Sequence, residues 1–476
     1  MKQYTFLLAT LLGIWIPAMG QNKQLLYDFN EIPQSLMVNP GVETDFSWYS
    51  GIPVLSGISF QAGSSGISVN DIFADDGVDI NTKIRERAVF GINPRDELSG
   101  TYQVELLNVG FRGTDPDIFY SLGMYHEGDA IGYWFQDYAI LAYEGNADRL
   151  NQRFDLGHLK TRGEMMNVFH FGINKRVNSE LTIGGRAKVY SSIFDFNSTR
   201  NKGYFVTTEG QNNILASTID ADMQLRTSGI EALRDAQDEG NLGQTILKRG
   251  LLGGNLGIGV DLGFSYHLNE QTVFTASVLD LGFVYHTNDV KTYTLNGSAT
   301  VEGIEIILPD ALADPNRDFW QDLVDEVETF VPFEDNTDGY IAFRPTKLNA
   351  SLRYDFGEQQ ASRVACDCGT APRGGSFRSK FANSVGGQLY MINRPRGPQS
   401  ALSAFYMRRL GNAMAVKTTY TVDKFTFTNV GLGLNLQAGP VNLYVLADNL
   451  LAYRNLADSR YASLQFGLNI ISWGRN

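Results

Sequence analysis

The chain has 476 residues, and 52 Asp and Glu against 39 Lys and Arg give a formal net charge of −13. This acidic balance argues against nucleic acid as a partner, because phosphate binding needs clustered Lys and Arg. No stretch beyond the first twenty residues approaches 18 uninterrupted apolar residues, so helical membrane spans are excluded.

The first twenty residues read as an export signal. Lys2 supplies the positive charge, residues 6–17 form a short apolar core, and Ala18-Met19-Gly20 has the small-x-small pattern of a cleavage site. We therefore expect a signal peptide over residues 1–20 and a mature chain that begins at Gln21. A buried N-terminal helix is the alternative.

Residues 21–45 do not read as a membrane-spanning strand. Pro33 and Pro40 each lack a backbone donor, and Asn39-Pro40-Gly41 is a turn signal. A segment of this kind before the first strand predicts a hatch inside a barrel lumen or an ordered periplasmic tail. Both readings stay open, and Asn39, Pro40 and Gly41 are the candidate hatch residues.

Strand-like patterning then recurs over residues 46–476, in segments of about ten residues, the length that a tilted strand needs to cross a bilayer. Residues 180–190 show it best, with Arg186 and Lys188 on the polar face as candidate lumen residues. Arg344 and Arg353 are expected to point inward as well. Residues 429–438 and 462–471 alternate in the same way. On one face of the first segment lie Leu181, Ile183, Gly185, Ala187 and Val189, and on the other Thr182, Gly184, Arg186, Lys188 and Tyr190.

These segments predict an all-β fold, an antiparallel transmembrane β-barrel of about 14 strands, since such barrels have an even number. Short turns at residues 409–412 and 438–440 are typical of the periplasmic side of such barrels. Aromatic residues at 133–135 and Trp473 are expected in the interfacial girdles. A secreted β-sandwich or propeller would give a similar composition.

Two polar insertions interrupt the pattern, near residues 211–250 and 304–335. Composition favours a short helix over residues 223–238, and apolar residues repeat at helical spacing over 314–329, behind Asp314-Pro315. We expect both insertions to be long extracellular loops containing short helices. Two interpretations stay open for these loops. They are solvated loops packed on the rim of the barrel, or they have a role in binding a partner or capping the channel.

Catalytic, cofactor-binding and metal-binding signatures are absent from the sequence, which argues against an enzyme. The five histidines are scattered, and His170 reads as a lumen-facing polar residue. Cys366 and Cys368 are the unusual local feature. In an exported protein they predict a disulfide first, with free thiols or a metal or redox role as alternatives.

Several motifs carry a family resemblance. LYDFNEIPQSLMVNPG (26–41), SGISFQAGSSGISVNDIF (56–73) and residues 257–283, with Asp261-Leu262-Gly263, resemble an uncharacterised exported family of Bacteroidota, catalogued as a domain of unknown function. Residues 431–451 resemble barrels that accompany type IX secretion and gliding. Both are similar to long-chain fatty-acid transporter-like barrels, in which an N-terminal segment with an Asn-Pro-small motif plugs the lumen. That motif maps onto Asn39-Pro40-Gly41.

The resemblance implies a barrel in the outer membrane of a Gram-negative cell, in contact with its lipid and without a cofactor. The first functional expectation is transport or binding of a small hydrophobic ligand. The alternative is an accessory barrel that anchors a type IX secretion, gliding or adhesin component, with a surface-exposed protein as partner.

Overall fold

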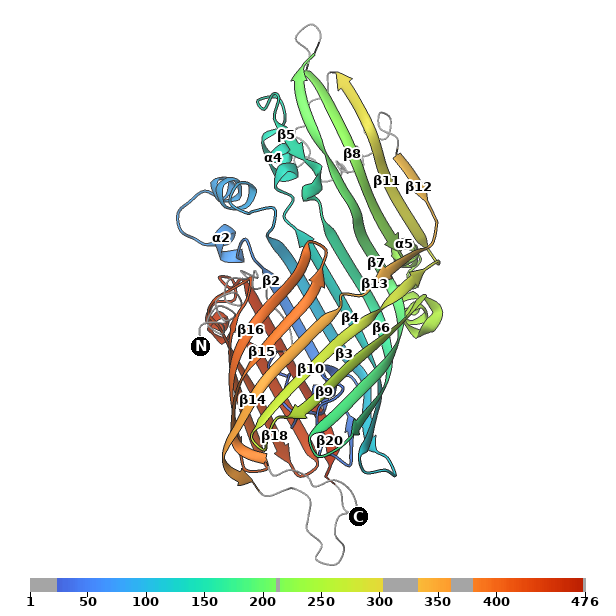
Figure 1. Cartoon of the computed structure of the whole chain (residues 1–476). Helices are drawn as coiled ribbons and strands as arrows, with labels where there is room; N and C mark the ends of the chain where they lie inside the picture. Colours follow the sequence, from blue (N-terminus) through green and yellow to red (C-terminus); the bar gives the residue numbers. More distant parts are fainter. Residues whose placement is uncertain (1–23, 211–214, 303–332, 361–379, 474–476) are drawn as a thin grey trace, which may run out of the picture.

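A single antiparallel sheet closes on itself to form the body of the molecule (Figure 1). The computed structural model describes residues 24–210, 215–302, 333–360 and 380–473. Within these residues, fourteen strand positions follow one another around the wall. The last strand, β20 (Tyr461–Ser472), pairs with β1 (Trp48–Gly51) and β2 (Ile58–Ser64), which both pair with β3 (Glu97–Arg112), and this closes the ring. The predicted all-β barrel and its even strand number are confirmed.

The remaining wall strands pair mostly with their neighbours in the chain, as hairpins do. After β3 come β4 (Ile118–Tyr133), β6 (Thr161–Arg176), β7 (Leu181–Glu209), β9 (Asn255–His267), β10 (Thr272–His286) and the collinear pair β13 (Tyr340–Phe343) and β14 (Lys347–Gln360). The second half comprises β15 (Lys380–Arg394), β16 (Gly397–Leu410), β17 (Met414–Val422), β18 (Asn429–Ala438) and β19 (Val441–Asp448).

The two ends of the barrel differ in the length of their connections. Short turns join β3 to β4, β6 to β7, β9 to β10, β16 to β17 and β18 to β19 at one end, called the turn end below. Gly411 and Gly439 sit in two of these turns with φ of 61° and 57°, a conformation that glycine adopts without strain. The other end, called the extension end, carries the long connections from β2 to β3, from β4 to β6 and from β7 to β9.

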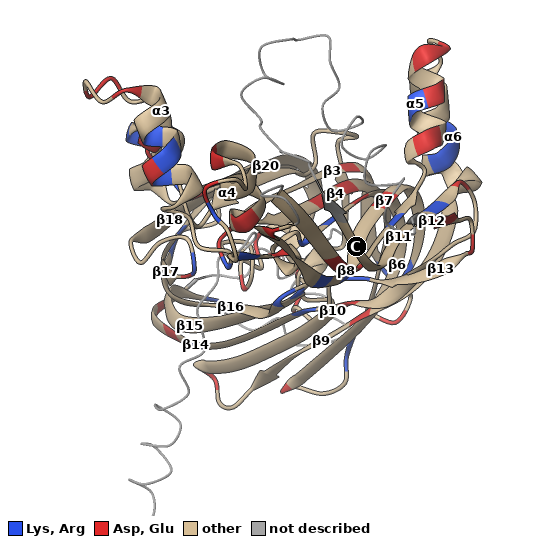
Figure 2. Cartoon of the chain, turned by 90° about the horizontal axis from the view of Figure 1, so that it is seen from above, with Lys and Arg blue, Asp and Glu red and all other residues tan. Residues whose placement is uncertain are grey.

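The strands form because apolar and polar side chains alternate along them. On β7, Ile183 and Val189 are exposed on the outer face while Arg186 and Lys188 are buried inside. The strands β18 and β20 show the expected alternation too. Figure 2 shows few charged residues along the wall and many inside the ring. Exposed apolar residues on the outer face include Ile173, Ile183, Val189, Ile258, Leu262, Leu348, Leu352, Val385, Leu402, Val445 and Leu464.

An aromatic row borders the turn end on the outside. Trp48 lies opposite Phe111 in the register, the Phe111 and Tyr120 rings are 5.7 Å apart, and Tyr120 and Phe171 are 6.1 Å apart. Of the girdle positions predicted from sequence, Phe135 is exposed, whereas Tyr133 is buried. Trp134 packs beneath a helix at the extension end, and Trp473 lies 5.0 Å from the Phe46 ring, because both side chains find apolar neighbours within the fold.

Beyond the barrel, the sheet continues as an extension (Figure 1). The upper part of β7 pairs with β8 (Leu215–Ser228), β8 with β11 (Val290–Glu302), and β11 with β12 (Phe333–Asn336). The short strand β5 (Arg153–Asp155) borders β7 on its other side. Helix α4 (Gln136–Glu144) packs Ala139 and Ile140 on this sheet. Helices α2 (Val69–Phe73), α3 (Ile80–Lys83), α5 (Ile230–Asp238) and α6 (Leu242–Lys248) lie in the long connections.

The extension corrects part of the predicted loop at 211–250. Residues 215–228 are strand β8, and the helix expected over 223–238 begins only at Ile230. Hydrogen-bonding neighbours on both sides of β8 satisfy its backbone and override the helical propensity of residues 223–226. The signal peptide 1–20, the helix expected over 314–329, and Cys366 and Cys368 lie outside the described residues.

The apolar outer face makes a first prediction. Leu402 lies near the middle of β16 and is 61% exposed, so Leu402→Arg places a charge on the apolar outer face. We expect the free energy of unfolding in lipid vesicles to fall by about 2–4 kcal/mol, as for cations near a bilayer midplane. Urea titration followed by tryptophan fluorescence measures it. The matched control is Leu247→Arg on α6, which is 60% exposed outside the wall. An equal loss in both variants would contradict a lipid-facing β16.

Candidate functional site

Residues 24–45, called the luminal segment, run through the inside of the barrel (dark blue in Figure 1). They contain one 3₁₀ turn, Pro33–Met37, and their backbone carbonyls are bound by wall side chains. Asn174 Nδ2 donates to Pro40 O over 2.7 Å, Ser277 Oγ to Val38 O over 2.7 Å, and Gln388 Nε2 to Tyr27 O over 3.1 Å. Three strands, β6, β10 and β15, therefore hold one irregular stretch of chain.

The three candidate hatch residues lie against two wall glycines. Asn39 Oδ1 accepts a 2.9 Å hydrogen bond from Gly41 N, which closes the turn. A Cβ at Gly184 would lie 1.9 Å from Pro40 O, and one at Gly263 would lie 2.1 Å from Asn39 Oδ1. Only glycine allows this approach, so the wall and the turn fit each other at backbone distance.

The two candidate lumen residues belong to one buried ion-pair network. Arg186 Nε donates to Asp261 Oδ2 over 2.7 Å, and its Nη2 donates to Met37 O over 2.7 Å. Lys188 Nζ lies 2.9 Å from Asp261 Oδ2 and 2.6 Å from Asp280 Oδ1. All four side chains are buried, so charges inside the lumen are compensated as low dielectric requires. Arg186 thereby ties the wall to the luminal segment.

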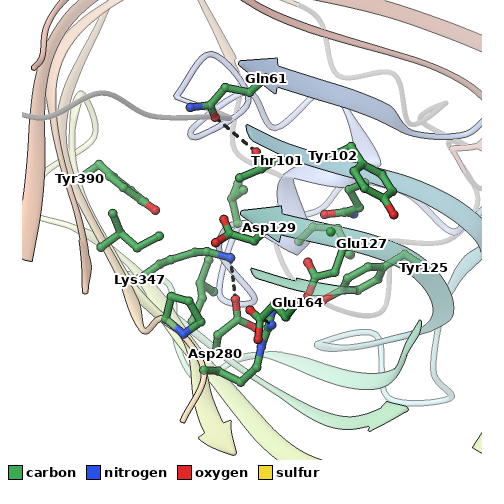
Figure 3. Close-up of a pocket in the computed structure, with 18 of the residues that line it drawn as sticks. Gln61, Thr101, Tyr102, Tyr125, Glu127, Asp129, Glu164, Asp280, Lys347 and Tyr390 are labelled. Carbon is green, nitrogen blue, oxygen red and sulfur yellow. Dashed lines mark hydrogen bonds and ion pairs between the residues drawn. The ribbon is translucent and has the colours of Figure 1, made fainter. Parts of the chain in front are cut away.

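A cavity of about 90 Å³ lies on the extension side of the luminal segment and is called the upper cavity. Met37, Val38, Leu279 and Ile392 give it apolar surface. Figure 3 shows carboxylates and Lys347 pointing into the same space. Its charged lining consists of Glu127, Asp129, Glu164 and Asp280 with Lys188, Arg344, Lys347 and Arg394.

The charges of the upper cavity are paired across its walls. Arg344 bridges Glu127 on β4 and Glu164 on β6, Arg394 contacts Asp129, and Lys347 Nζ lies 2.7 Å from Asp280 Oδ2. The four acids and four bases cancel in formal charge. The cavity can accept a polar group by exchanging partners without creating a net charge.

A second cavity, called the lower cavity, lies on the turn side and has a volume of about 50 Å³. Glu31 of the luminal segment is anchored beside it, because Arg409 Nε donates to Glu31 Oε1 over 2.6 Å. The lower cavity is lined by Asn30, Glu43, Asp45, Arg176, His267, Glu270, Arg353, Asp355, Lys380, Phe381 and Arg409. The luminal segment thus separates two charged cavities.

Glu31 links the anchoring to pH. Burial alone raises the pKa of its carboxyl, but the charges of Arg409 and Lys380 more than offset this and hold the pKa below its ordinary value. A depressed folded pKa stabilises the docked state above the unfolded pKa of about 4.3. That stabilisation is lost as pH falls through the folded pKa.

Apolar packing holds the luminal segment on the side of β16 to β19. Leu25, Leu26, Phe29 and Ile32 are buried there against Met407, Ala415, Tyr444 and Leu446 of the wall. Each buried aliphatic side chain contributes roughly 1.5–3 kcal/mol relative to exposure. This side of the lumen combines apolar packing with polar contacts, since Lys417 Nζ also donates to Tyr27 O and Thr421 Oγ1 donates to Gln24 Oε1 over 2.9 Å.

Sequence reasoning placed Arg186, Lys188, Arg344 and Arg353 inside but missed their acidic partners. Asp261 and Asp280 lie on inward-facing positions of β9 and β10, and the register pairs Arg186 with Asp261. Alternation along β9 could have found Asp261, but Asp280 lies at a bulge with φ of 58°, where Leu279 and Asp280 are both buried and alternation fails. His170 is buried in the lumen as expected.

Some kinds of site have no candidate in the described part of the chain. Residues 24–210, 215–302, 333–360 and 380–473 bring together no group of three or more His, Cys, Asp or Glu that could hold a metal ion. Across the same ranges no helix is long and apolar enough to cross a bilayer.

Comparison with known proteins yields a family and several distant structures. A model described as a family of unknown function, DUF5723, matches residues 40–448. The toluene transporter TodX of Pseudomonas putida is 10% identical over 96% of this chain and 94% of its own, with a TM-score of 0.34. The toluene transporter TbuX of Ralstonia pickettii is 10% identical over 92% of each chain, at 0.37. A FadL homologue of Pseudomonas aeruginosa is 8% identical over 96% and 98%, at 0.40. No curated protein matches the sequence.

Proposed function

The chain belongs to the DUF5723 family of unknown function, and we propose that it is an outer-membrane barrel that binds or passes a small ligand through its lumen. In this proposal the signal peptide exports it, and the apolar outer face contacts the lipid of the outer membrane. The aromatic row at the turn end supports this placement, since such rows border the apolar band of membrane barrels.

The luminal segment acts as the hatch in this proposal. The observation that carries it is that residues 24–45 fill the lumen between two cavities, each lined by charged residues. The segment is held by hydrogen bonds, ion pairs and side-chain packing, all of which can be exchanged for water when it moves. Displacement of the segment would join the two cavities.

The upper cavity is the proposed ligand site. The apolar side chains of Met37, Val38 and Leu279 line this cavity beside the paired charges. Such a lining suits a small molecule with a hydrophobic body and a polar group. This keeps the hydrophobic ligand that the sequence resemblance implies, and it adds a polar group that the cavity recognises. The proposal includes no catalytic activity.

Conductance of single molecules in a planar bilayer tests the proposal. The refolded chain is compared with a variant that lacks residues 21–45. We expect conductance to rise by about tenfold on deletion, because the lumen would then hold water along its whole length. Heat-modifiable mobility on a gel confirms that both barrels are folded. If both barrels are folded and both have a conductance near zero, the result would contradict the luminal segment as a hatch and also the lumen as a path for the ligand.

A further inference from the structure

Residues 249–254, called the outer loop, join α6 to β9 on the outside of the barrel wall. Asn167 on β6, Ser191 on β7 and Leu256 on β9 form one register row of the sheet. Leu256 is 46% exposed on the outer face, so Asn167 and Ser191 point outward as well. Both are nevertheless buried, because the outer loop covers them. Figure 2 shows α5 and α6, which lead into this loop, outside the ring of strands.

The two covered side chains fix the outer loop to the wall. Asn167 Nδ2 donates to Gly250 O over 3.1 Å, and Ser191 Oγ donates to Arg249 O over 2.6 Å. Ser191 Oγ also accepts a 3.1 Å hydrogen bond from Leu252 N. Arg249 Nε adds a 2.8 Å bond to a backbone oxygen of β7. Lipid offers no hydrogen bonds, so polar groups on the outside of a membrane barrel need partners of this kind. The outer loop therefore has a fixed place on the wall.

The outer loop exposes two consecutive leucines. Leu251 is 49% exposed and Leu252 is 52% exposed. Leu252 also has φ of 65°, in the left-handed region that a leucine seldom adopts and that costs free energy. Conformations of this kind persist where other interactions hold them, and they gather at sites of function. The chain holds the backbone of Leu252 through Ser191 but leaves half of its side chain uncovered.

These leucines lie at the extension-side border of the apolar outer face. Leu252 lies beside Leu256, because Ser191 binds Leu252 N and is the register partner of Leu256. Tyr266 is exposed on the same face of β9 near the turn end, as an aromatic residue at a membrane border is. The roughly ten residues from Leu256 to Tyr266, at about 3.3 Å each and a tilt of about 40°, span about 25 Å of height. This is the height of the apolar band of a membrane barrel.

Helix α5 of the same insertion has the opposite character. It exposes Arg234, Asp235 and Asp238, and it buries Ala236. Charged side chains on one side and exposed leucines on the other are typical of segments that lie in the border region of a bilayer. A lipid leaflet satisfies both surfaces, since water and acyl chains meet at its border. The leucines also continue the apolar face of the wall, so one lipid phase covers both.

We propose that the outer loop is an interfacial anchor, in which the side chains of Leu251 and Leu252 enter the lipid leaflet on the extension side while α5 stays in water. The anchor rests on the proposed membrane barrel, but not on the hatch or on passage of a ligand. It fixes the depth of the barrel in the bilayer at the end opposite the aromatic row. This assigns a lipid contact to the insertion near residues 211–250.

Spin labels on single cysteines in phosphatidylcholine vesicles test the anchor, with Cys366 and Cys368 replaced by serine. The labels are placed at Leu252→Cys, at Asp238→Cys on the polar side of α5, and at Leu402→Cys on the outer wall. Molecular oxygen, which collects in lipid, and a polar nickel complex, which stays in water, relax the label. We expect the ratio of oxygen to nickel accessibility to be at least about tenfold higher at Leu252→Cys than at Asp238→Cys, because acyl chains exclude the polar complex.

The label at Leu402→Cys separates failure of the anchor from failure of the membrane barrel. If it reports lipid while Leu252→Cys reports water, the anchor is overturned and the membrane barrel stands. If Leu402→Cys also reports water, the proposed barrel fails and the anchor with it. Low accessibility to both agents at Leu252→Cys would indicate a protein contact and would overturn the anchor too. Heat-modifiable mobility shows which variants fold, and Leu251→Cys takes the place of Leu252→Cys if that variant does not.

Discussion

Gly184→Val is expected to dislodge the luminal segment and give the barrel a conductance close to that of the deletion variant. The new Cβ would lie 1.9 Å from Pro40 O and 2.6 Å from Gly41 N. Both atoms belong to backbone, so no side-chain rotation relieves the overlap. Overpacking of this kind destabilises by about 1–3 kcal/mol or more, and here the luminal segment can move while the wall strand is fixed by two neighbours.

The adjacent glycine supplies the control. A Cβ at Gly185 would meet its nearest atom, a methyl carbon of Leu262, at 3.7 Å, which is ordinary contact on the outer face. Gly185→Val should keep the low conductance and the protease resistance of the full-length chain. Limited proteolysis checks the structural part, since a displaced segment exposes residues 24–45 to cleavage. If Gly184→Val keeps both its protease resistance and its low conductance, the luminal segment stays in the lumen despite the added Cβ, and the prediction is contradicted.

Arg186→Met should lower the free energy of unfolding by about 3–5 kcal/mol, because it leaves the buried Asp261 carboxylate with a single cation. It also removes donors from Leu36 O and Met37 O, so the luminal segment should become more accessible to protease. Urea titration in vesicles measures the first effect, and cleavage within residues 24–45 measures the second.

The control for Arg186→Met is a substitution in an exposed ion pair on the extension. Arg200 and Asp222 are 50% and 43% exposed, and Arg200 Nη1 lies 3.4 Å from Asp222 Oδ1. Surface pairs of this kind contribute about 0–1 kcal/mol, so Arg200→Met should leave both stability and protease resistance nearly unchanged. Equal effects of the two substitutions would contradict a buried, charge-compensated lumen.

The wall was predictable because alternation is local. Residues 180–190 showed Arg186 and Lys188 on the polar face, and β7 buries both. The luminal position of Asn39, Pro40 and Gly41 was only one of two readings. Proline and turn chemistry exclude a strand, but they do not say what the segment packs against. Its partners lie far away in the chain, as Gly184 and Gly263 do.

The extension and the aromatic row could not be predicted for the same reason. Residues 223–226 favour a helix by composition, and only pairing with β7 and β11 makes them strand. Trp134 and Trp473 carry no local sign of burial, whereas Trp48 and Phe111 form the row because the register places them side by side.

The position of the luminal segment also constrains the order of folding. Gln34 Nε2 donates to Asn469 Oδ1 over 2.9 Å, a contact between residues 435 positions apart, and Gln34 also binds Glu105 on the strand across the seam. The part of the chain that is synthesised first cannot complete its contacts until the last strand has closed on the first. Loop closure of this length comes late in folding. The segment therefore stabilises the finished barrel mainly by slowing its opening, since contacts absent from the transition state act on the unfolding rate.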